Sequence, residues 1–257
     1  TPPLLPPRPF LLPRPFLLRR HFLSAALIGL LLSTHAPAAD QTATWNGTTG
    51  IWSDFTKWNT NPLFPNNGNG GSTFDAGQST GTSTVDQAIT IQKLTMSGGT
   101  NTGTGSTLTM NDLFSFGAGT LNGTGTVQAD GGVAFTVTNT TLSGGRTLNL
   151  GGNSTWSAGA IQFFDNSVLT NQAGATLTTN FNGSLSGGSA AGTFNNAGTF
   201  TKSGGTGTTT IAITATNTGT ISGDSGTLSF SSTSIVTQHV GTTLTGGTWN
   251  VSNGSTR

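Results

Sequence analysis

The chain has 257 residues, of which only 7% are charged, and its nine Lys and Arg nearly balance its eight Asp and Glu. Beyond position 38 the basic residues are Lys57, Lys93, Arg146, Lys202 and Arg257, whereas all eight acidic residues, each an Asp, remain there. This leaves no basic patch for a phosphate backbone, which excludes a nucleic-acid-binding protein. The lack of Cys excludes a disulfide framework and thiol chemistry.

Residues 1–38 have the order of an export leader. A Pro-Arg-Pro-Phe-Leu-Leu segment at 7–12 repeats at 13–18, Arg19 and Arg20 follow, and an apolar run at 22–32 leads to small residues ending at Ala38. This order predicts a signal peptide with cleavage after Ala38. The apolar run is shorter than the ~20 residues that span a bilayer. We expect residues 1–18 to lie upstream of the true start and general secretion to be the route, while the paired Arg19 and Arg20 leave a twin-arginine route open.

Residues 39–74 contain three of the five Trp residues, namely Trp45, Trp52 and Trp58. A stack of repeats exposes its first unit to water and its terminal units are atypical, so clustered aromatic rings predict an N-terminal cap. The alternative is a binding platform for an extracellular glycan, because exposed aromatic faces stack on sugar rings. That alternative requires coplanar, exposed rings. Residues 62–72, rich in Asn and Gly, are expected to form a loop.

Residues 75–257 carry an internal repeat. The motif Asn-x-Gly-Thr followed by an apolar residue begins at Asn196 and again at Asn217, 21 residues later. Glycines that precede short apolar segments recur at similar intervals, at Gly131, Gly152, Gly174, Gly198, Gly219 and Gly241. A period of about 22 residues predicts one strand-rich unit stacked on copies of itself. A β-sandwich would give turn signals every 8–12 residues without register between distant copies.

The strand segments of this repeat alternate in polarity. Ile211, Ile213 and Ala215 occupy every second position, which predicts one side in a core and the other in solvent. Triplets of Ser-Gly-Gly or Thr-Gly-Gly at 97–99, 143–145, 186–188, 203–205 and 245–247 are expected to mark a second corner of the unit. Asn side chains at the turns are expected to form hydrogen-bonded ladders.

These patterns together predict an all-β fold, a right-handed parallel β-helix (β-solenoid) with rungs of about 22 residues and an aromatic N-terminal cap. The expected division is a leader at 1–38, the Trp-rich cap at 39–74 and the solenoid at 75–257. A full rung from Gly241 would run to about residue 262, so we expect the solenoid to be truncated at Arg257.

The opening Trp-Asn-Gly at Trp45, the spaced Trp52 and Trp58, and the Asn-x-Gly-Thr-apolar rungs resemble bacterial exported β-helix proteins. Two kinds share these features: autotransporter passenger-like chains and repeat proteins with a PEP-CTERM sorting tail. The resemblance covers residues 44–257 and implies export to the cell surface, the outer membrane or the medium. We recognise neither a C-terminal barrel nor a sorting helix in the printed residues, so a further C-terminal region is expected.

Residues that carry catalysis are few. His239 is the only His beyond position 38 and is expected on the surface, since base catalysis needs a second positioned group. Asp112 and Asp130 differ by 18 positions and would need a register shift to form the paired carboxylates of a glycosidase. The Gly-rich turn around Asp224 offers one carboxylate, too few for Ca²⁺. We therefore predict no catalytic residue, no metal site and no cofactor.

Pairs of Thr separated by one residue are typical of flat, ice-binding faces. Here such pairs start at Thr102, Thr107, Thr124, Thr136 and Thr218, and these starts do not recur at the rung period. We therefore interpret them as strand-favouring residues on an outer face.

The sequence as a whole predicts a structural or adhesive β-helix stalk that a bacterium displays on its surface, without catalysis. The alternatives are a polysaccharide-active enzyme and a carbohydrate-binding β-helix that uses Trp45, Trp52 and Trp58. The expected partners are extracellular glycans or cell-surface components, with no nucleic acid and no membrane span in the mature part.

Overall fold

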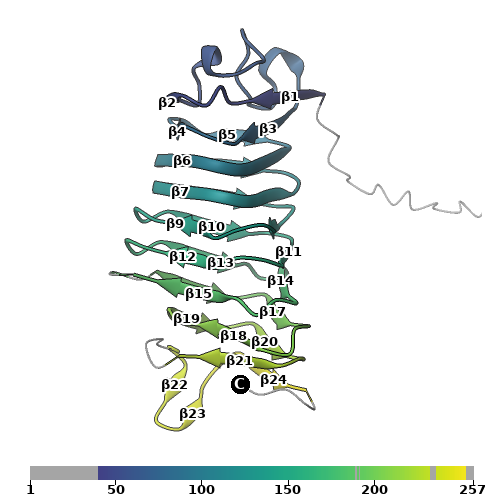
Figure 1. The fold of residues 1–257 in the computed structure, drawn as a ribbon, viewed down its shortest axis with the longest axis vertical. Coiled ribbons are helices and arrows are strands. Elements are labelled where there is room, and N and C mark those ends of the chain that lie inside the picture. The colour runs from purple at the N-terminus through teal and green to yellow at the C-terminus, as the bar shows by residue number, and fades with distance from the viewer. Residues whose placement is uncertain (1–39, 189, 191, 232–235, 253–257) are drawn as a thin grey trace, which may run out of the picture. The chain divides into compact units, whose positions relative to one another are not determined.

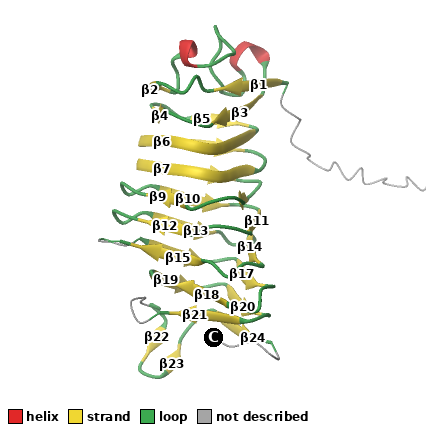
Figure 2. Ribbon diagram, in the orientation of Figure 1, coloured by secondary structure: helices red, strands yellow, loops and turns green. Residues whose placement is uncertain are grey.

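The computed structural model describes residues 40–188, 190, 192–231 and 236–252. The expected leader at 1–38 and the expected truncation at Arg257 lie outside the described residues. The described part is a stack of parallel strands, coloured from purple to yellow along the chain in Figure 1 and almost entirely strand and loop in Figure 2. The predicted β-solenoid is confirmed, with rungs of about 21 residues. Among the described residues, no helix has the length and hydropathy needed to cross a membrane.

Each rung contributes strands to three faces, named A, B and C in the order in which the chain passes through them. Face A contains β1 (Gln41–Thr44), β3 (Phe74–Gln78), the first parts of β6 (Lys93–Met110) and β7 (Phe114–Ala129), β8 (Val133–Phe135), β11 (Asn153–Trp156), β14 (Thr176–Thr179), β17 (Thr199–Lys202), β20 (Thr220–Gly223) and β24 (Thr248–Val251).

Face B contains β2 (Thr49–Ile51), β4 (Thr82–Val85), the middle of β6 and β7, β9 (Thr140–Leu142), β12 (Ile161–Phe163), β15 (Ser184–Gly187), β18 (Thr208–Ile211) and β21 (Thr227–Phe230). Face C contains β5 (Ile89–Ile91), the ends of β6 and β7, β10 (Thr147–Leu150), β13 (Val168–Asn171), β16 (Thr193–Asn196) and β19 (Thr214–Asn217). Because β6 and β7 run across all three faces, their pairing shifts register at the corners.

Alternation along each strand builds the core. On face C the inward positions of successive strands are all buried and in register: Leu108, Val127, Leu148, Leu169 and Phe194. Burying one such side chain contributes about 1.5–3 kcal/mol, and the stack repeats that contribution at every rung. Ile211, Ile213 and Ala215 are buried as predicted. They do not share one strand, since Ile211 ends β18, Ala215 lies in β19, and Ile213 lies in the turn from face B to face C between them.

The Asn-x-Gly-Thr motif forms the corner between faces C and A. Asn171, Asn196 and Asn217 end successive strands of face C, point inward and are buried. The Nδ2 of Asn171 donates to Oδ1 of Asn196 (2.7 Å), and Nδ2 of Asn196 donates to Oδ1 of Asn217 (2.8 Å), which confirms the predicted ladder. A Cβ at Gly219 would overlap the carbonyl oxygen of Gly198 one rung away, so the motif requires Gly where the corners stack.

Two predictions about the corners were wrong. Gly241 does not open a rung, because it lies in an antiparallel hairpin of β22 (His239–Val240) and β23 (Thr243–Leu244), and Gly247 precedes the next face A strand instead. The Gly-Gly triplets do not mark a single corner. Those at 97–99 and 203–205 lie between faces A and B, whereas those at 143–145 and 186–188 lie between faces B and C.

The predicted cap contains the start of the solenoid itself. Within 39–74, β1 already pairs with β3 on face A and β2 with β4 on face B. The connection from β2 to β3 carries two short 3-10 helices, η1 (Phe55–Lys57) and η2 (Asn69–Gly71), the second of which falls in the expected 62–72 loop. Trp52 and Trp58 of this connection form an aromatic cluster at the N-terminal end of the stack together with Trp45, which lies between β1 and β2.

Candidate functional site

The three N-terminal Trp side chains pack against each other at the end of the stack. The ring centroid of Trp58 lies 5.0 Å from that of Trp45 at an interplanar angle of 74°, and 4.7 Å from that of Trp52 at 58°. Each indole N–H donates to a backbone carbonyl: Trp45 to Thr48 (2.9 Å), Trp52 to Pro65 (2.8 Å) and Trp58 to Trp52 (2.8 Å). Their exposed fractions are 3%, 0% and 3% for Trp45, Trp52 and Trp58.

This geometry is that of a cap. The backbone N–H of Trp45 donates to the carbonyl of Gly77 and that of Trp52 to the carbonyl of Thr84, which ties the cluster to the next rung. Rings that recognise sugars must present a face to solvent, and these tilted, buried rings do not. Trp45, Trp52 and Trp58 therefore do not form the exposed, coplanar platform that the glycan-binding alternative requires.

The carboxylates that the sequence singled out do not form a pair. The β6–β7 register aligns Met110 with Ala129, so Asp112 and Asp130 are one position out of step. Asp112 instead forms an exposed ion pair with Lys93 (3.5 Å), and Oδ1 of Asp130 accepts a hydrogen bond from Nε2 of Gln128 (2.7 Å). Within the described ranges, no group of three His, Cys, Asp or Glu residues is placed to hold a metal ion.

A buried cation lies inside the upper part of the stack. The side chain of Arg146 is fully buried, and its guanidinium occupies the space that Gly103 leaves free, since a Cβ there would overlap it. Nη1 donates to the carbonyl of Thr124 (2.7 Å) and Nη2 to Oδ1 of Asn101 (3.1 Å), whereas Nε has no partner. Desolvation lowers the pKa of Arg146 to about 10. Sequence reasoning missed this residue, because its burial depends on a Gly 43 positions away.

A second buried cation lies at the corner between faces A and B. Lys202 is fully buried, and its Nζ donates to Oδ1 of Asn182 (3.0 Å) and to the carbonyl of Gly204 (2.9 Å). Desolvation lowers the pKa of Lys202. Arg146 binds oxygens of the two preceding rungs, and Lys202 binds one oxygen of the preceding rung and one of its own corner, so both cations serve to hold the corners.

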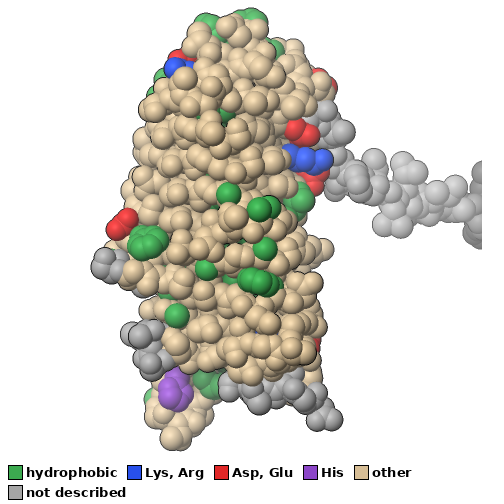
Figure 3. Space-filling view, in the orientation of Figure 1, with side chains coloured by type: hydrophobic (Ala, Val, Ile, Leu, Met, Phe, Trp, Pro, Cys, Tyr) green, Lys and Arg blue, Asp and Glu red, His purple; other side chains and the backbone are tan. Residues whose placement is uncertain are grey.

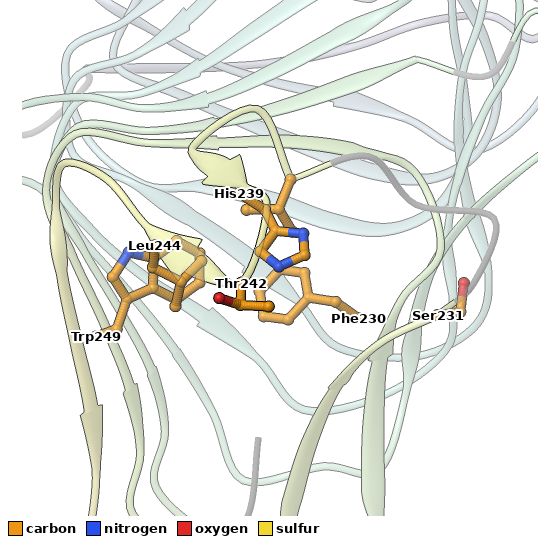
Figure 4. A pocket seen from close by; sticks show the side chains of 7 residues that line it. Phe230, Ser231, His239, Thr242, Leu244 and Trp249 are labelled. Atoms are coloured by element: carbon orange, nitrogen blue, oxygen red, sulfur yellow. The ribbon is translucent and has the colours of Figure 1, made fainter.

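A hollow of about 470 Å³ opens at the C-terminal end of the described stack. Figure 4 shows its lining, in which Phe230 and Trp249 pack edge to face with ring centroids 5.5 Å apart. His239 is exposed, as predicted, and is the single titratable side chain among the described residues that line this hollow. An acid–base mechanism needs a second positioned group, and the described part of the lining does not supply one.

The outer side of face C carries two rows of side chains aligned across six rungs. The first row is Thr107, Thr126, Thr147, Val168, Thr193 and Thr214. The second row, two residues further along each strand, is Thr109, Gln128, Asn149, Thr170, Asn195 and Thr216. All twelve are partly exposed and none is charged. Thr occupies both rows only on β6 and β19, so the prediction that Thr pairs do not recur at the rung period agrees with the register, although single Thr positions do align from rung to rung.

In comparisons with known proteins, no family model, no curated protein and no solved structure matches this chain.

Proposed function

We propose that the chain is the β-helix stalk of a bacterial exported protein, with a structural or adhesive role at the cell surface and no catalysis of its own. The observation that carries the proposal is the parallel ladder that continues on face C from β5 to β19 without a break in pairing. A solenoid in which every rung is bonded to both neighbours resists bending, because bending strains many hydrogen bonds together.

The interior supports this mechanical role. Apolar side chains fill the core at every rung, and the corners are held by the Asn ladder, Arg146 and Lys202. The surface is dominated by uncharged polar groups, and charged side chains are sparse on the side seen in Figure 3. Such a surface suits a spacer that stays in solution without binding charged polymers.

Export is proposed from the leader sequence, and the autotransporter-like or PEP-CTERM-like type is proposed from the resemblance of the rungs. The polysaccharide-active alternative is not favoured, because the Asp residues that would supply its acid and base do not meet. The carbohydrate-binding alternative loses its platform, because the three Trp rings are buried.

The test is to express the full chain with a C-terminal epitope tag in a Gram-negative host, beside a variant without residues 1–38. The proposal predicts that the mature chain begins at Ala39 and that an antibody reaches the tag on intact cells or in the medium. The variant without the leader should stay inside the cell. An uncleaved, intracellular chain would contradict export, and release of reducing ends from a polysaccharide panel by the purified chain would contradict the absence of catalysis.

A further inference from the structure

The two rows on the outer side of face C form a lattice. Neighbouring strands of a sheet lie ~4.8 Å apart, and alternate residues along a strand lie ~6.6 Å apart. These two spacings define a rectangular unit cell, which the strand register repeats across six rungs. The rows therefore extend for about 24 Å along the stack. A rectangular array of this cell size is close to the repeat of oxygen atoms on the prism faces of ice.

The side chains of this lattice are chemically suited to ordered water. Five of the six positions in the first row are Thr, and the sixth is Val168, which keeps the branched shape without the hydroxyl. Each Thr presents a methyl group, around which water forms a cage, beside a hydroxyl that both donates and accepts. β-Branched side chains have few rotamers, so little freedom is lost when a solid lattice is bound.

The charge of the face also matches. None of the twelve positions carries a charge, so no strongly hydrated ion must be stripped before a neutral lattice is bound. Each face has one carboxylate at its edge, since Asp130 accepts a hydrogen bond from Gln128 of the second face C row and Asp224 accepts from Ser222 and Ser252 beside face A. Face A also has Thr rows, but it carries in addition the Lys93–Asp112 pair among its upper rungs.

The core beneath face C supports the array. Beneath each pair of outer positions lies a buried side chain of the core, and β13, β16 and β19 end in the Asn ladder. This arrangement fixes both spacings of the lattice before any ligand is present.

We propose that the outer side of face C, centred on Thr147, Thr170 and Thr193, binds the surface of ice. This inference does not depend on export or on the stalk role, since it needs only the folded solenoid.

The experiment uses the purified full chain, labelled with a fluorophore at its N-terminus, and follows its adsorption to a growing ice crystal together with thermal hysteresis. The face C variant is Thr147→Lys with Thr193→Lys. The matched control is Thr155→Lys with Thr201→Lys, which places the same two substitutions two rungs apart on the outer side of face A. Circular dichroism confirms that each variant keeps its β signal.

The proposal predicts that the wild type adsorbs and shows hysteresis, that the face C variant loses both, and that the face A control retains both. The proposal is overturned if the wild type does not adsorb, if the folded face C variant still adsorbs, or if the control loses adsorption equally. Should the double face C variant not fold, the single Thr147→Lys variant repeats the comparison.

Discussion

Replacing Asn196 with Ala removes the middle member of the buried Asn ladder. In the folded chain, Nδ2 of Asn196 donates to Oδ1 of Asn217 (2.8 Å) and to the carbonyl of Thr220 (2.9 Å), while its Oδ1 accepts from Nδ2 of Asn171 (2.7 Å). After the substitution, the oxygens of Asn217 and Thr220 lose this donor inside the stack. The Asn171 amide keeps its second bond, to the carbonyl of Thr199 (2.9 Å).

The expected cost follows from the two closest acceptors, since the third, the carbonyl of Gly198, lies farther from Nδ2, at 3.2 Å. A buried polar group left without its hydrogen bond costs about 1–3 kcal/mol, so two of them cost about 2–6 kcal/mol. That range is a large part of the ~5–15 kcal/mol that stabilises a typical domain. Because each rung contacts only its neighbours, the loss should concentrate in the rungs around β16 and β19.

The control is Asn195→Ala, one position away in the same strand. Asn195 points outward and is partly exposed, so its truncation should change stability by less than about 0.5 kcal/mol. Urea denaturation followed by circular dichroism gives the stability difference, and hydrogen exchange shows where protection is lost. Equal midpoints for the two variants would refute the structural role of the ladder.

Three further predictions follow from the corners, the cap and the buried cation. Gly219→Ala should lower the free energy of unfolding by several kcal/mol, because the added Cβ would overlap the carbonyl oxygen of Gly198. Gly77→Ala should be nearly neutral, because the nearest heavy atom to its Cβ would lie 3.9 Å away. Equal shifts of the melting temperature for the two variants would contradict this. Trp52→Ala should cost about 3–5 kcal/mol in urea denaturation, and a loss under about 1 kcal/mol would contradict the cap. The folded pKa of Arg146 lies below the unfolded value, so the unfolded chain binds more protons in alkaline solution. The free energy of unfolding of the wild type, measured relative to that of the Arg146→Met variant, should therefore rise by about 1 kcal/mol between about pH 9 and about pH 11. A fall over this range would contradict the burial of Arg146.

The fold was predictable because local patterns repeat at the rung period. Alternation placed Ile211, Ile213 and Ala215 in the core, and the Asn-x-Gly-Thr motif located a true corner. The hairpin around Gly241 was mistaken for a rung because an inserted turn and a corner have the same Gly-rich composition. Pairing across the stack distinguishes them, and pairing is not a local property.

The candidate sites were less predictable because they depend on register and on distant neighbours. The face C rows align only after loops of unequal length are taken into account: the β13–β16 register joins Val168 to Thr193, a longer step than the one from Thr147 to Val168. Burial of Arg146 depends on space at Gly103. The Trp cluster was expected as a cap or as a platform, and only the tilt and burial of its rings decide between them.

The central claim is that the rungs form one rigid, in-register stack, and the distance between two spin labels tests it most directly. The chain has no Cys, so Thr107→Cys and Thr214→Cys allow specific labelling at the two ends of the first face C row. Five rung steps of ~4.8 Å separate these positions, which gives about 24 Å between their backbones. The account predicts a single narrow distance distribution around that value, allowing for the label arms. A broad distribution, or one centred at a much longer distance, would contradict the rigid solenoid.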